Sequence, residues 1–227
     1  MWRYSLKQKW AGIRSKIKKQ PIHPWLVQAW QQSTFPNSQP CAQTSFLVVD
    51  LETSSLSVNE GEILSIGWVA IDNNKIQINS SQHLYLKNTQ TVGQSAIIHQ
   101  IRDCQLENGL TLEQALYALL QAACGRVLVF HHSPMDLDFL NYYSKKILGS
   151  KLYLPCADTL QIEKRYLDHI GKPIQNGDLT LAKTRTRYHL PNYMAHNALS
   201  DAIATAELLL AQLAHKGPKV NLGHILS

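Results

Sequence analysis

The 227-residue sequence predicts an α/β domain built on a mixed β-sheet, preceded by a helical, basic N-terminal extension. Two patterns support this prediction. Three strand-like runs follow one another between residues 46 and 86 with short turns, as in a meander of antiparallel strands. Helical and strand-like runs then alternate as far as residue 213, as in domains whose strands are joined by helical crossovers.

The first 45 residues differ from the rest of the chain. Apolar residues recur there at helical spacing with bases on the other side, which predicts an amphipathic helix. The apolar positions are Leu6, Trp10, Ile13 and Ile17. Prolines at 21 and 24 end this helix, and the run 25–30 predicts a second, short one. Residues 33–45 have the composition of a linker.

The three strands of the meander are predicted from runs of strand-forming residues. The first run, 46–49, leads into Asp50-Leu51-Glu52. The second covers 62–71 and meets the turn signal Asp72-Asn73-Asn74. The third alternates between apolar and polar residues over 75–86.

The later elements are predicted from periodicity and from caps. Thr111 with Gln114 three residues on is the signature of a helix start, and Gly149 follows the end of another helix. In order, we expect helices at 95–101 and 111–123, a buried strand at 127–130, a helix at 136–148, an edge strand at 152–154, and helices at 179–188 and 199–213. The resulting division is an extension over 1–45, a domain over 46–215 and a tail over 216–227.

The positive charge of the chain is concentrated in the extension. Of the 22 Lys and Arg residues, seven precede Asp50, whereas none of the 16 acids does. Such an arm favours a polyanion, so docking of nucleic acid or protein through it is one interpretation, and a solvated helix face is the other. Four of the five tryptophans also lie here, at positions 2, 10, 25 and 30, either to stack on bases or to pack against the domain.

The composition argues against several classes of protein. No apolar run has the length of a membrane span, and the basic N-terminus lacks the features of a secretory signal, so an integral membrane protein is not expected. The four cysteines (Cys41, Cys104, Cys124 and Cys156) are scattered without metal-ligand spacing. We therefore expect reduced thiols in a cytoplasmic protein and neither a disulfide framework nor a zinc site.

Four acids and a histidine are the candidate catalytic residues. Asp50 and Glu52 are two apart at the end of a strand, so their side chains point the same way. Asp136 lies at the start of a helix, where a carboxylate is favoured, and is preferred to its neighbour Asp138 because of the apolar residues that follow it.

Asp201 lies near the start of the last helix, and His196 precedes it on a loop. A histidine is well matched to take up a proton near neutral pH. Four carboxylates with few bases beside them could not stay ionised together without divalent cations, which predicts a two-metal site.

Three motifs, read in order, resemble those of the DEDDh 3′–5′ exonucleases, the superfamily of the bacterial polymerase III proofreading subunit, ribonuclease T and oligoribonuclease. The resemblance covers residues 46–213. The motifs read Phe-Leu-Val-Val-Asp50-Leu-Glu52-Thr, His-His-Ser-Pro-Met-Asp136-Leu-Asp-Phe-Leu and His196-Asn-Ala-Leu-Ser-Asp201-Ala. Weaker echoes of the family occur at 98–101 and 158–160.

The resemblance implies a ribonuclease H-like, five-stranded mixed sheet flanked by helices. It implies a metal-dependent 3′–5′ exonuclease that releases 5′-mononucleotides from single-stranded 3′ ends, with DNA the expected substrate in proofreading or repair. By analogy, two Mg²⁺ or Mn²⁺ ions would be held by Asp50, Glu52, Asp136 and Asp201. His196 would be the general base that deprotonates the attacking water.

The same resemblance implies residues that contact the terminal nucleotide, and we expect these to be Thr53, Ser55, Leu56, His99 and Met135. Phe130 is either a further lining residue or part of the core. The family usually has Gly in place of Ser55, Asn in place of His132 and Phe in place of Met135. These departures remove no metal ligand but affect the loop before Asp136 and the space for the terminal sugar.

Other interpretations remain open at this point. The substrate could be RNA, trimmed as by an oligoribonuclease, or the chain could be a non-enzymatic nucleic-acid-binding adaptor. The five intact motif residues argue against the adaptor. A third interpretation is a peripheral enzyme whose amphipathic basic helix binds anionic lipid. Five bases, either solvated or gripping the phosphate backbone upstream, are Lys164, Arg165, Lys183, Arg185 and Arg187.

Overall fold

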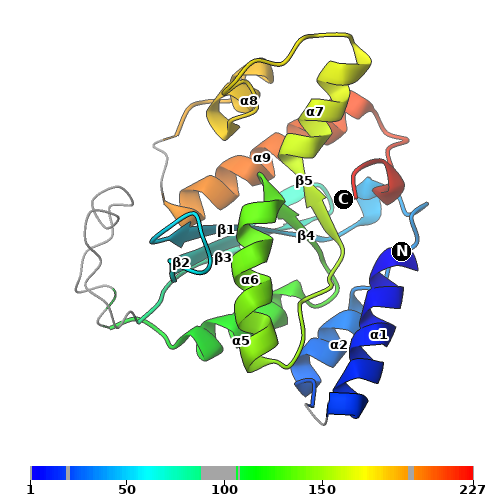
Figure 1. The fold of residues 1–227 in the computed structure, drawn as a ribbon. Coiled ribbons are helices and arrows are strands. Elements are labelled where there is room, and N and C mark those ends of the chain that lie inside the picture. The colour runs from blue at the N-terminus through cyan, green and yellow to red at the C-terminus, as the bar shows by residue number, and fades with distance from the viewer. Residues whose placement is uncertain (1, 19–20, 88–105, 107, 194–196, 227) are drawn as a thin grey trace.

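The computed structural model describes residues 2–18, 21–87, 106, 108–193 and 197–226. At its centre is a five-stranded sheet of order β3-β2-β1-β4-β5 (Figure 1). The strands are β1 (Phe46–Thr53), β2 (Ile63–Asp72), β3 (Lys75–Tyr85), β4 (Val127–Phe130) and β5 (Cys156–Asp158). β1, β2 and β3 pair antiparallel, whereas β4 pairs in parallel with both β1 and β5. The prediction of a mixed five-stranded sheet is confirmed.

The turn between β2 and β3 is the one that the sequence predicts. Asn73 and Asn74 both adopt left-handed backbone conformations, with φ of 52° and 58°. Two successive left-handed residues match the twist of a tight hairpin, and asparagine tolerates this conformation better than most residues. β2 and β3 therefore pair from Asp72 and Lys75 onward, with a shift of register between Trp68 and Ala70.

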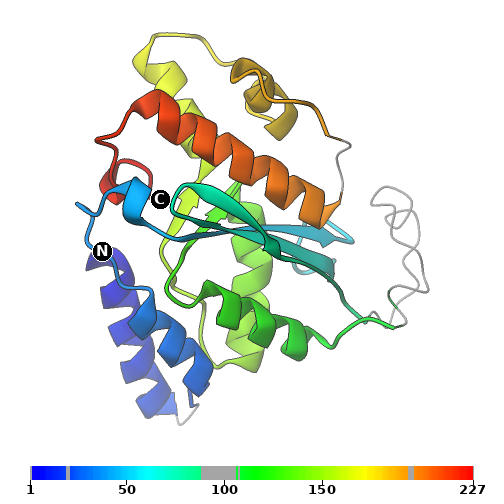
Figure 2. The same cartoon turned by 180° about the vertical axis from the view of Figure 1, so that it is seen from behind.

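Helices cover both faces of the sheet (Figures 1 and 2). On one face lie α5 (Leu112–Ala123) and α6 (Ser133–Ile147), and on the other lie α7 (Thr159–His169) and α9 (Ala198–Lys216). The short helix α8 (Leu181–Arg187) comes between α7 and α9 in the chain. The predicted capping box at the start of α5 is present, since Thr111 and Gln114 each accept a hydrogen bond from the other's backbone N–H.

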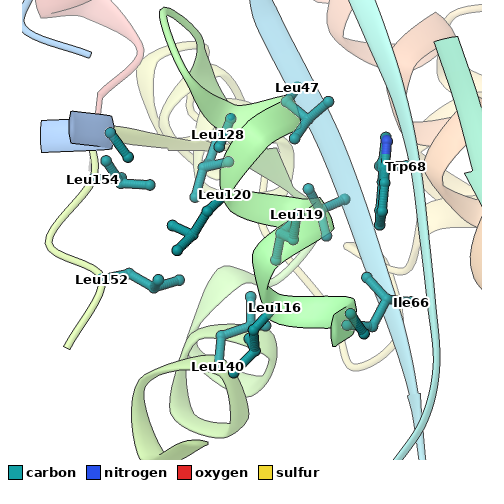
Figure 3. Packing of buried hydrophobic residues seen from close by; sticks show 14 of the residues in the cluster. Leu47, Ile66, Trp68, Leu116, Leu119, Leu120, Leu128, Leu140, Leu152 and Leu154 are labelled. Atoms are coloured by element: carbon teal, nitrogen blue, oxygen red, sulfur yellow. The ribbon is translucent and has the colours of Figure 1, made fainter. Parts of the chain in front are cut away.

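Side chains of β1 alternate between the two cores. Leu47 and Val49 join the cluster under α5 and α6, whereas Phe46 and Val48 join the cluster under α9. Figure 3 shows the first of these clusters, in which leucines of α5 meet Leu47 and Trp68 of the sheet. Because the alternation continues along the strand, Asp50 and Glu52 belong to the face covered by α9.

The two predicted helices of the extension are α1 (Trp2–Lys18) and α2 (Pro24–Gln32), and they differ in burial. α2 contributes Leu26, Ala29 and Trp30 to the core beneath α5. The Trp30 indole N–H donates to the carbonyl of Leu152, so one of the tryptophans packs as the structural interpretation expects.

α1 lies on the surface (Figure 1). It contacts the domain through the Tyr4 hydroxyl, 3.4 Å from the Cys156 sulfur, and the Gln8 amide, which donates to the Tyr153 carbonyl at 2.9 Å. Its apolar residues Leu6, Trp10 and Ile13 are 48%, 64% and 50% exposed. The described apolar side chains of the amphipathic helix are therefore turned outward, so of the two interpretations of the tryptophans, packing against the domain does not hold for Trp10.

Three details of the sequence prediction need correction or fall outside the description. The predicted edge strand at 152–154 is wrong, since the strand lies at Cys156–Asp158, beyond Pro155. At Leu152 the backbone N–H donates to the Asn141 side chain and the carbonyl accepts from Trp30, so neither is available to a ladder. α7 was not predicted at all. The helix expected at 95–101 lies outside the described residues.

The segment after α9 returns to the domain. It contains the 3-10 helix η2 (Leu222–His224), and Leu222 and Ile225 are buried in the core under α9. Isolated bridges join Asn221 to Pro40 and Leu226 to Ala157. Across the described residues, no helix combines the length and the apolar character that crossing a membrane requires.

Gly67 allows α9 to approach the sheet. It is the β2 residue paired with Asp50 of β1, and a Cβ at this position would overlap the backbone of Ala198 and Leu199 at the start of α9. Glycine is the residue that lets two backbones come this close. The absent side chain at position 67 therefore fixes how near the first turn of α9 lies to the end of β1.

We predict that Gly67→Ala lowers the free energy of unfolding by about 3 kcal/mol, because the methyl group must displace the start of α9. Urea unfolding followed by circular dichroism measures this change. Gly12→Ala in α1 is the matched control, since a Cβ there meets nothing within 4 Å, and its effect should stay within about 1 kcal/mol. Equal effects of the two substitutions would contradict the proposed contact.

Candidate active site

The site begins at the end of β1, where Asp50 and Glu52 follow the apolar residues of the strand. Asp50 is half-buried, and Glu52 is 5% exposed. Both lie on the face that carries α9, as their spacing of two residues predicts. The register with β2 shifts between Glu52 and Thr53, and Thr53 pairs with Ile63 before the chain enters the next loop.

The third acid comes from the first turn of α9. The Asn197 side chain caps this helix by accepting from the Ser200 N–H at 3.1 Å, and the Asp201 N–H donates to the Asn197 carbonyl at 2.9 Å. One carboxylate oxygen from each of Asp50, Glu52 and Asp201 lies within 4.8 Å of the others. The prediction that the first and third motifs meet in space is confirmed by this geometry.

Asp136 lies in the first turn of α6 and is 4% exposed. It is not one of the three residues whose oxygens lie within 4.8 Å, but its charge acts on Asp50 and that of Glu52 acts on it. α6 begins at Ser133, three residues earlier than the sequence predicts. Asp136 is thus turned into the fold, whereas its neighbour Asp138 is exposed.

Asp158 braces the start of α6, and sequence reasoning gave it no such role. Its buried carboxylate accepts from the backbone N–H groups of His132 and Ser133 at 3.0 and 2.9 Å. The same carboxylate caps α7 through the Leu160 N–H at 2.9 Å. One side chain therefore joins two helix N-termini and fixes the turn that carries Asp136.

His131 completes this brace. Its ring nitrogens lie 2.8 Å from the Thr159 hydroxyl and 2.9 Å from the Leu179 carbonyl. Burial lowers the pKa of His131 to about 4, so the ring is neutral at pH 7. His132 adopts a left-handed conformation with φ of 72°. The loop before Asp136 is therefore held by Asp158 and His131, although His132 stands where the family usually has asparagine.

The carboxylates oppose one another's ionisation. Burial, followed by the charges of Asp136, Asp201 and Glu52, raises the pKa of Asp50 well above its ordinary value. Burial and then the charge of Asp201 raise the pKa of Glu52 from 4.5 to about 8. Burial is also the main cause that raises the pKa of Asp136 from 3.8 to about 8.

This donor set fits hard divalent cations. Carboxylate oxygens are the ligands that Mg²⁺ and Mn²⁺ prefer, and three of them lie close enough together here to share an ion. The raised pKa values also indicate a cation site, because a bound cation would offset the repulsion that keeps the acids protonated.

The loop after β1 holds the residues expected at the terminal nucleotide. Leu56 is 83% exposed, which leaves its side chain free to contact a base or sugar. Thr53 is buried, and its hydroxyl donates to the Ser55 carbonyl at 2.8 Å. The Ser55 hydroxyl accepts from the Ser57 N–H at 3.2 Å, and its Cβ faces Gly61. Ser55 therefore builds the loop itself, and its side chain does not project freely.

Other expected residues are placed as follows. Met135 is half-buried at the start of α6, and Phe130 is fully buried, which makes Phe130 a core residue. His99 and His196 lie outside the described residues.

The expectation for two of the five upstream bases is wrong. The Arg185 guanidinium is 2% exposed and pairs with Glu207 at 2.8 Å, and Arg187 pairs with the buried Glu163 at 2.7 Å. Arg185 also donates to the Pro191 carbonyl at 2.7 Å. These arginines hold α8 and the segment after it against α7 and α9, so they neither grip phosphate nor face solvent freely.

A mixed sheet whose strand β1 ends in two acids, joined there by Asp201 of α9 and by the charge of the buried Asp136 of α6, defines the class of this protein, a nuclease of ribonuclease H-like fold. The chain belongs to the RNase T-type exonuclease family, whose model matches residues 47–209. That match includes all four acids. The recognition made from the three motifs is confirmed.

Relatives of similar sequence include DNA polymerases III of the PolC type and DNA polymerase III epsilon subunits. The chain is 28% identical to a PolC-type DNA polymerase III of Thermotoga petrophila over 83% of this chain but only 13% of that protein. It is 24% identical to the DNA polymerase III subunit epsilon of Aquifex aeolicus, over 81% of this chain and 87% of that one. The chain thus spans a small part of the first relative and most of the second.

Among solved structures, the fold resembles the nuclease domain of a DEDDh family member bound to rAMP. The TM-score is 0.64 at 16% identity, over 83% of this chain and 98% of that chain. At this identity the likeness concerns the fold, including the mixed sheet and the helices that cover it.

The raised pKa values predict that the metal-free protein loses stability as pH rises. Between about pH 4.5 and 8 the folded carboxyls hold protons that the unfolded chain has released, so the free energy of unfolding falls through this window. Divalent cations bind the ionised form. The rise in melting temperature caused by Mg²⁺ should therefore be larger at about pH 8 than at about pH 5.5.

Thermal unfolding in chelator and in Mg²⁺ at both pH values measures this difference. Glu52→Gln is the control, because it removes one of the titrating groups and should flatten the pH dependence in chelator. A melting temperature that does not fall with pH in the metal-free wild type would contradict the electrostatic description.

Proposed function

We propose that the chain is a metal-dependent 3′–5′ exonuclease that releases 5′-mononucleotides from single-stranded 3′ ends. The observation that carries the proposal is the gathering of Asp50, Glu52 and Asp201 within 4.8 Å, with the buried Asp136 acting on Asp50 by its charge. Membership of the exonuclease family supports it. Burying several acids together is unfavourable in free energy and is rare where the acids have only a structural role. Bound divalent cations would compensate the buried negative charge.

The residues that would hold two cations, Mg²⁺ or Mn²⁺, are Asp50, Glu52, Asp136 and Asp201. By analogy with the family, Asp50, Glu52 and Asp201 would be ligands of the ions, and Asp136 would act near them. When bound, such ions stabilise the negative charge that grows on the phosphate and hold the attacking and leaving oxygens.

The other side chains would bind and orient the terminal nucleotide and take up the proton. Leu56, exposed on the loop after β1, would meet the last base or sugar. Thr53, Ser55, His99 and Met135 would shape the space around it. We assign His196 as the general base that takes the proton of the attacking water.

We propose DNA as the substrate, in proofreading or repair. The names of the polymerase III relatives support this choice. RNA is the second candidate substrate, since the DEDDh nuclease domain of similar fold was solved with rAMP. A non-enzymatic adaptor is the less favoured alternative, because a decayed site would not keep four acids gathered.

Further parts of the proposal concern the rest of the chain. We propose a cytoplasmic protein, with residues 1–45 as an extension to the exonuclease domain at 46–215 and residues 216–227 as its tail. The extension would dock nucleic acid or protein through its bases, as the exposed side chains of α1 allow.

We predict that Asp136→Asn removes metal-dependent hydrolysis, at least about a thousandfold in rate, and leaves the fold intact. Asp138→Asn is the matched control, two positions further on the same helix but exposed, and should retain full activity. Matched 5′-labelled DNA and RNA oligomers, incubated with Mg²⁺, Mn²⁺ or chelator, measure both the activity and the preferred sugar.

Asp50→Ala should be equally inactive in this assay. The proposal fails if wild-type protein degrades neither polymer with either metal, or if Asp136→Asn keeps its activity.

We predict that His196→Ala lowers the turnover number by about a hundredfold or more, while the metal concentration needed for half-maximal stabilisation changes little. A general base acts on the reaction, whereas the four acids would hold the ions. Steady-state rates and Mg²⁺-dependent melting measure the two effects separately. An unchanged rate would refute the assignment of His196 as the base.

A further inference from the structure

A basic groove of about 480 Å³ lies between α1 and the end of α6. α1 lines one wall with Lys7, Trp10 and Arg14, and the other wall carries Lys145 of α6 and Lys151 after it. Among the described residues that line this groove, four are bases and none is an acid. The two walls come from parts of the chain more than 130 residues apart, so the groove exists only in the folded protein.

The way α1 is seated leaves this groove open. α1 faces the domain with Tyr4 and Gln8, through which it makes its contacts to Cys156 and Tyr153. Trp10 remains 64% exposed at the edge of the groove. The side chains of all four groove bases are exposed to solvent. Positive charge on both walls and an exposed aromatic ring are the features of surfaces that track a single nucleic-acid strand.

We propose that this groove binds the single strand upstream of the 3′ end that is being degraded, an inference that rests on the proposed function. Phosphates would pair with bases on both walls, and Trp10 would stack on a base. Lys145 lies on the same helix as Asp136, about 14 Å further along its axis at 1.5 Å per residue. At the 3.4 Å spacing of a stacked strand, about four nucleotides bridge that distance.

The shape of the groove favours nucleic acid over a lipid surface. An anionic bilayer is flat and would meet the outward side of α1, where Leu6 and Ile13 are exposed. The bases of α1 line one hollow together with Lys145 and Lys151, and a flat surface is a poor match for charges carried on two walls. A strand of nucleic acid can follow such a hollow and carries the matching charge.

The test compares groove bases with bases on the same protein that lie outside the groove. Lys145→Gln/Lys151→Gln and Trp10→Ala alter the groove, whereas Lys9→Gln/Lys16→Gln alters exposed bases of α1 that do not line it. Each is combined with Asp50→Ala in chelator, so that binding of labelled single-stranded DNA of about 4 and about 20 nucleotides is measured without hydrolysis.

We expect Lys145→Gln/Lys151→Gln to weaken binding of the longer strand about tenfold and to make the salt slope shallower by about 1.4. Trp10→Ala should weaken it about fivefold without changing the slope. Binding of the shorter strand, and its hydrolysis when Asp50 is present, should stay unchanged. The Lys9→Gln/Lys16→Gln control, which lowers the general charge of α1 and leaves the groove intact, should lose no more than about twofold in affinity.

An unchanged salt slope in Lys145→Gln/Lys151→Gln would overturn the inference, as would an equal loss in the control. Binding to phosphatidylglycerol vesicles that requires Leu6 and Ile13, with unchanged affinity for the longer strand in the groove variants, would replace nucleic acid by lipid as the partner. These outcomes are distinct from a failure of the proposed function, which would appear as absent hydrolysis of the shorter strand by the wild type.

Discussion

The close approach of α9 to the sheet at Gly67 is the contact on which the candidate site depends. Gly67 pairs with Asp50, and the start of α9 occupies the space that a side chain at position 67 would fill. Only because of this approach does the first turn of α9 bring Asp201 beside the two acids of β1. Because residue 67 has no side chain, the end of β1 and the start of α9 lie close enough for their carboxylates to form a cluster.

The cluster stores unfavourable electrostatic free energy that the surrounding fold must withstand. Burial and mutual repulsion raise the pKa values of its acids, and a protein gains no stability from such an arrangement by itself. The bracing around it is correspondingly firm: Asp158 joins the starts of α6 and α7, and Arg185 pins the segment after α8. Bound divalent cations would make the electrostatic free energy of the ionised carboxylates favourable. Metal binding would therefore contribute both to the stability of the fold and to the chemistry of the site.

The extension combines two structural roles. α2 is part of the core, since Leu26 and Trp30 pack beneath α5. Deletion of the whole extension would therefore expose that core to solvent. α1 rests on the surface through contacts that include the hydrogen bonds of Tyr4 and Gln8 and the packing of Ala11, and it presents bases and apolar side chains outward. Substitutions in a surface helix of this kind change the free energy of unfolding little. Such a helix can therefore carry residues that bind a partner.

The sequence alone determined the mixed sheet, the turn at Asn73 and the acids, because strand periodicity, turn chemistry and motif spacing are local properties. It misplaced the edge strand at 152–154, since the hydrogen bonds of Leu152 to Asn141 and Trp30 are tertiary contacts. It also could not show that Asp158 braces two helices or that Arg185 is buried, because both depend on partners distant in sequence. Only the folded structure decided how close Asp50, Glu52 and Asp201 come, since that distance is set by the packing of α9 over Gly67.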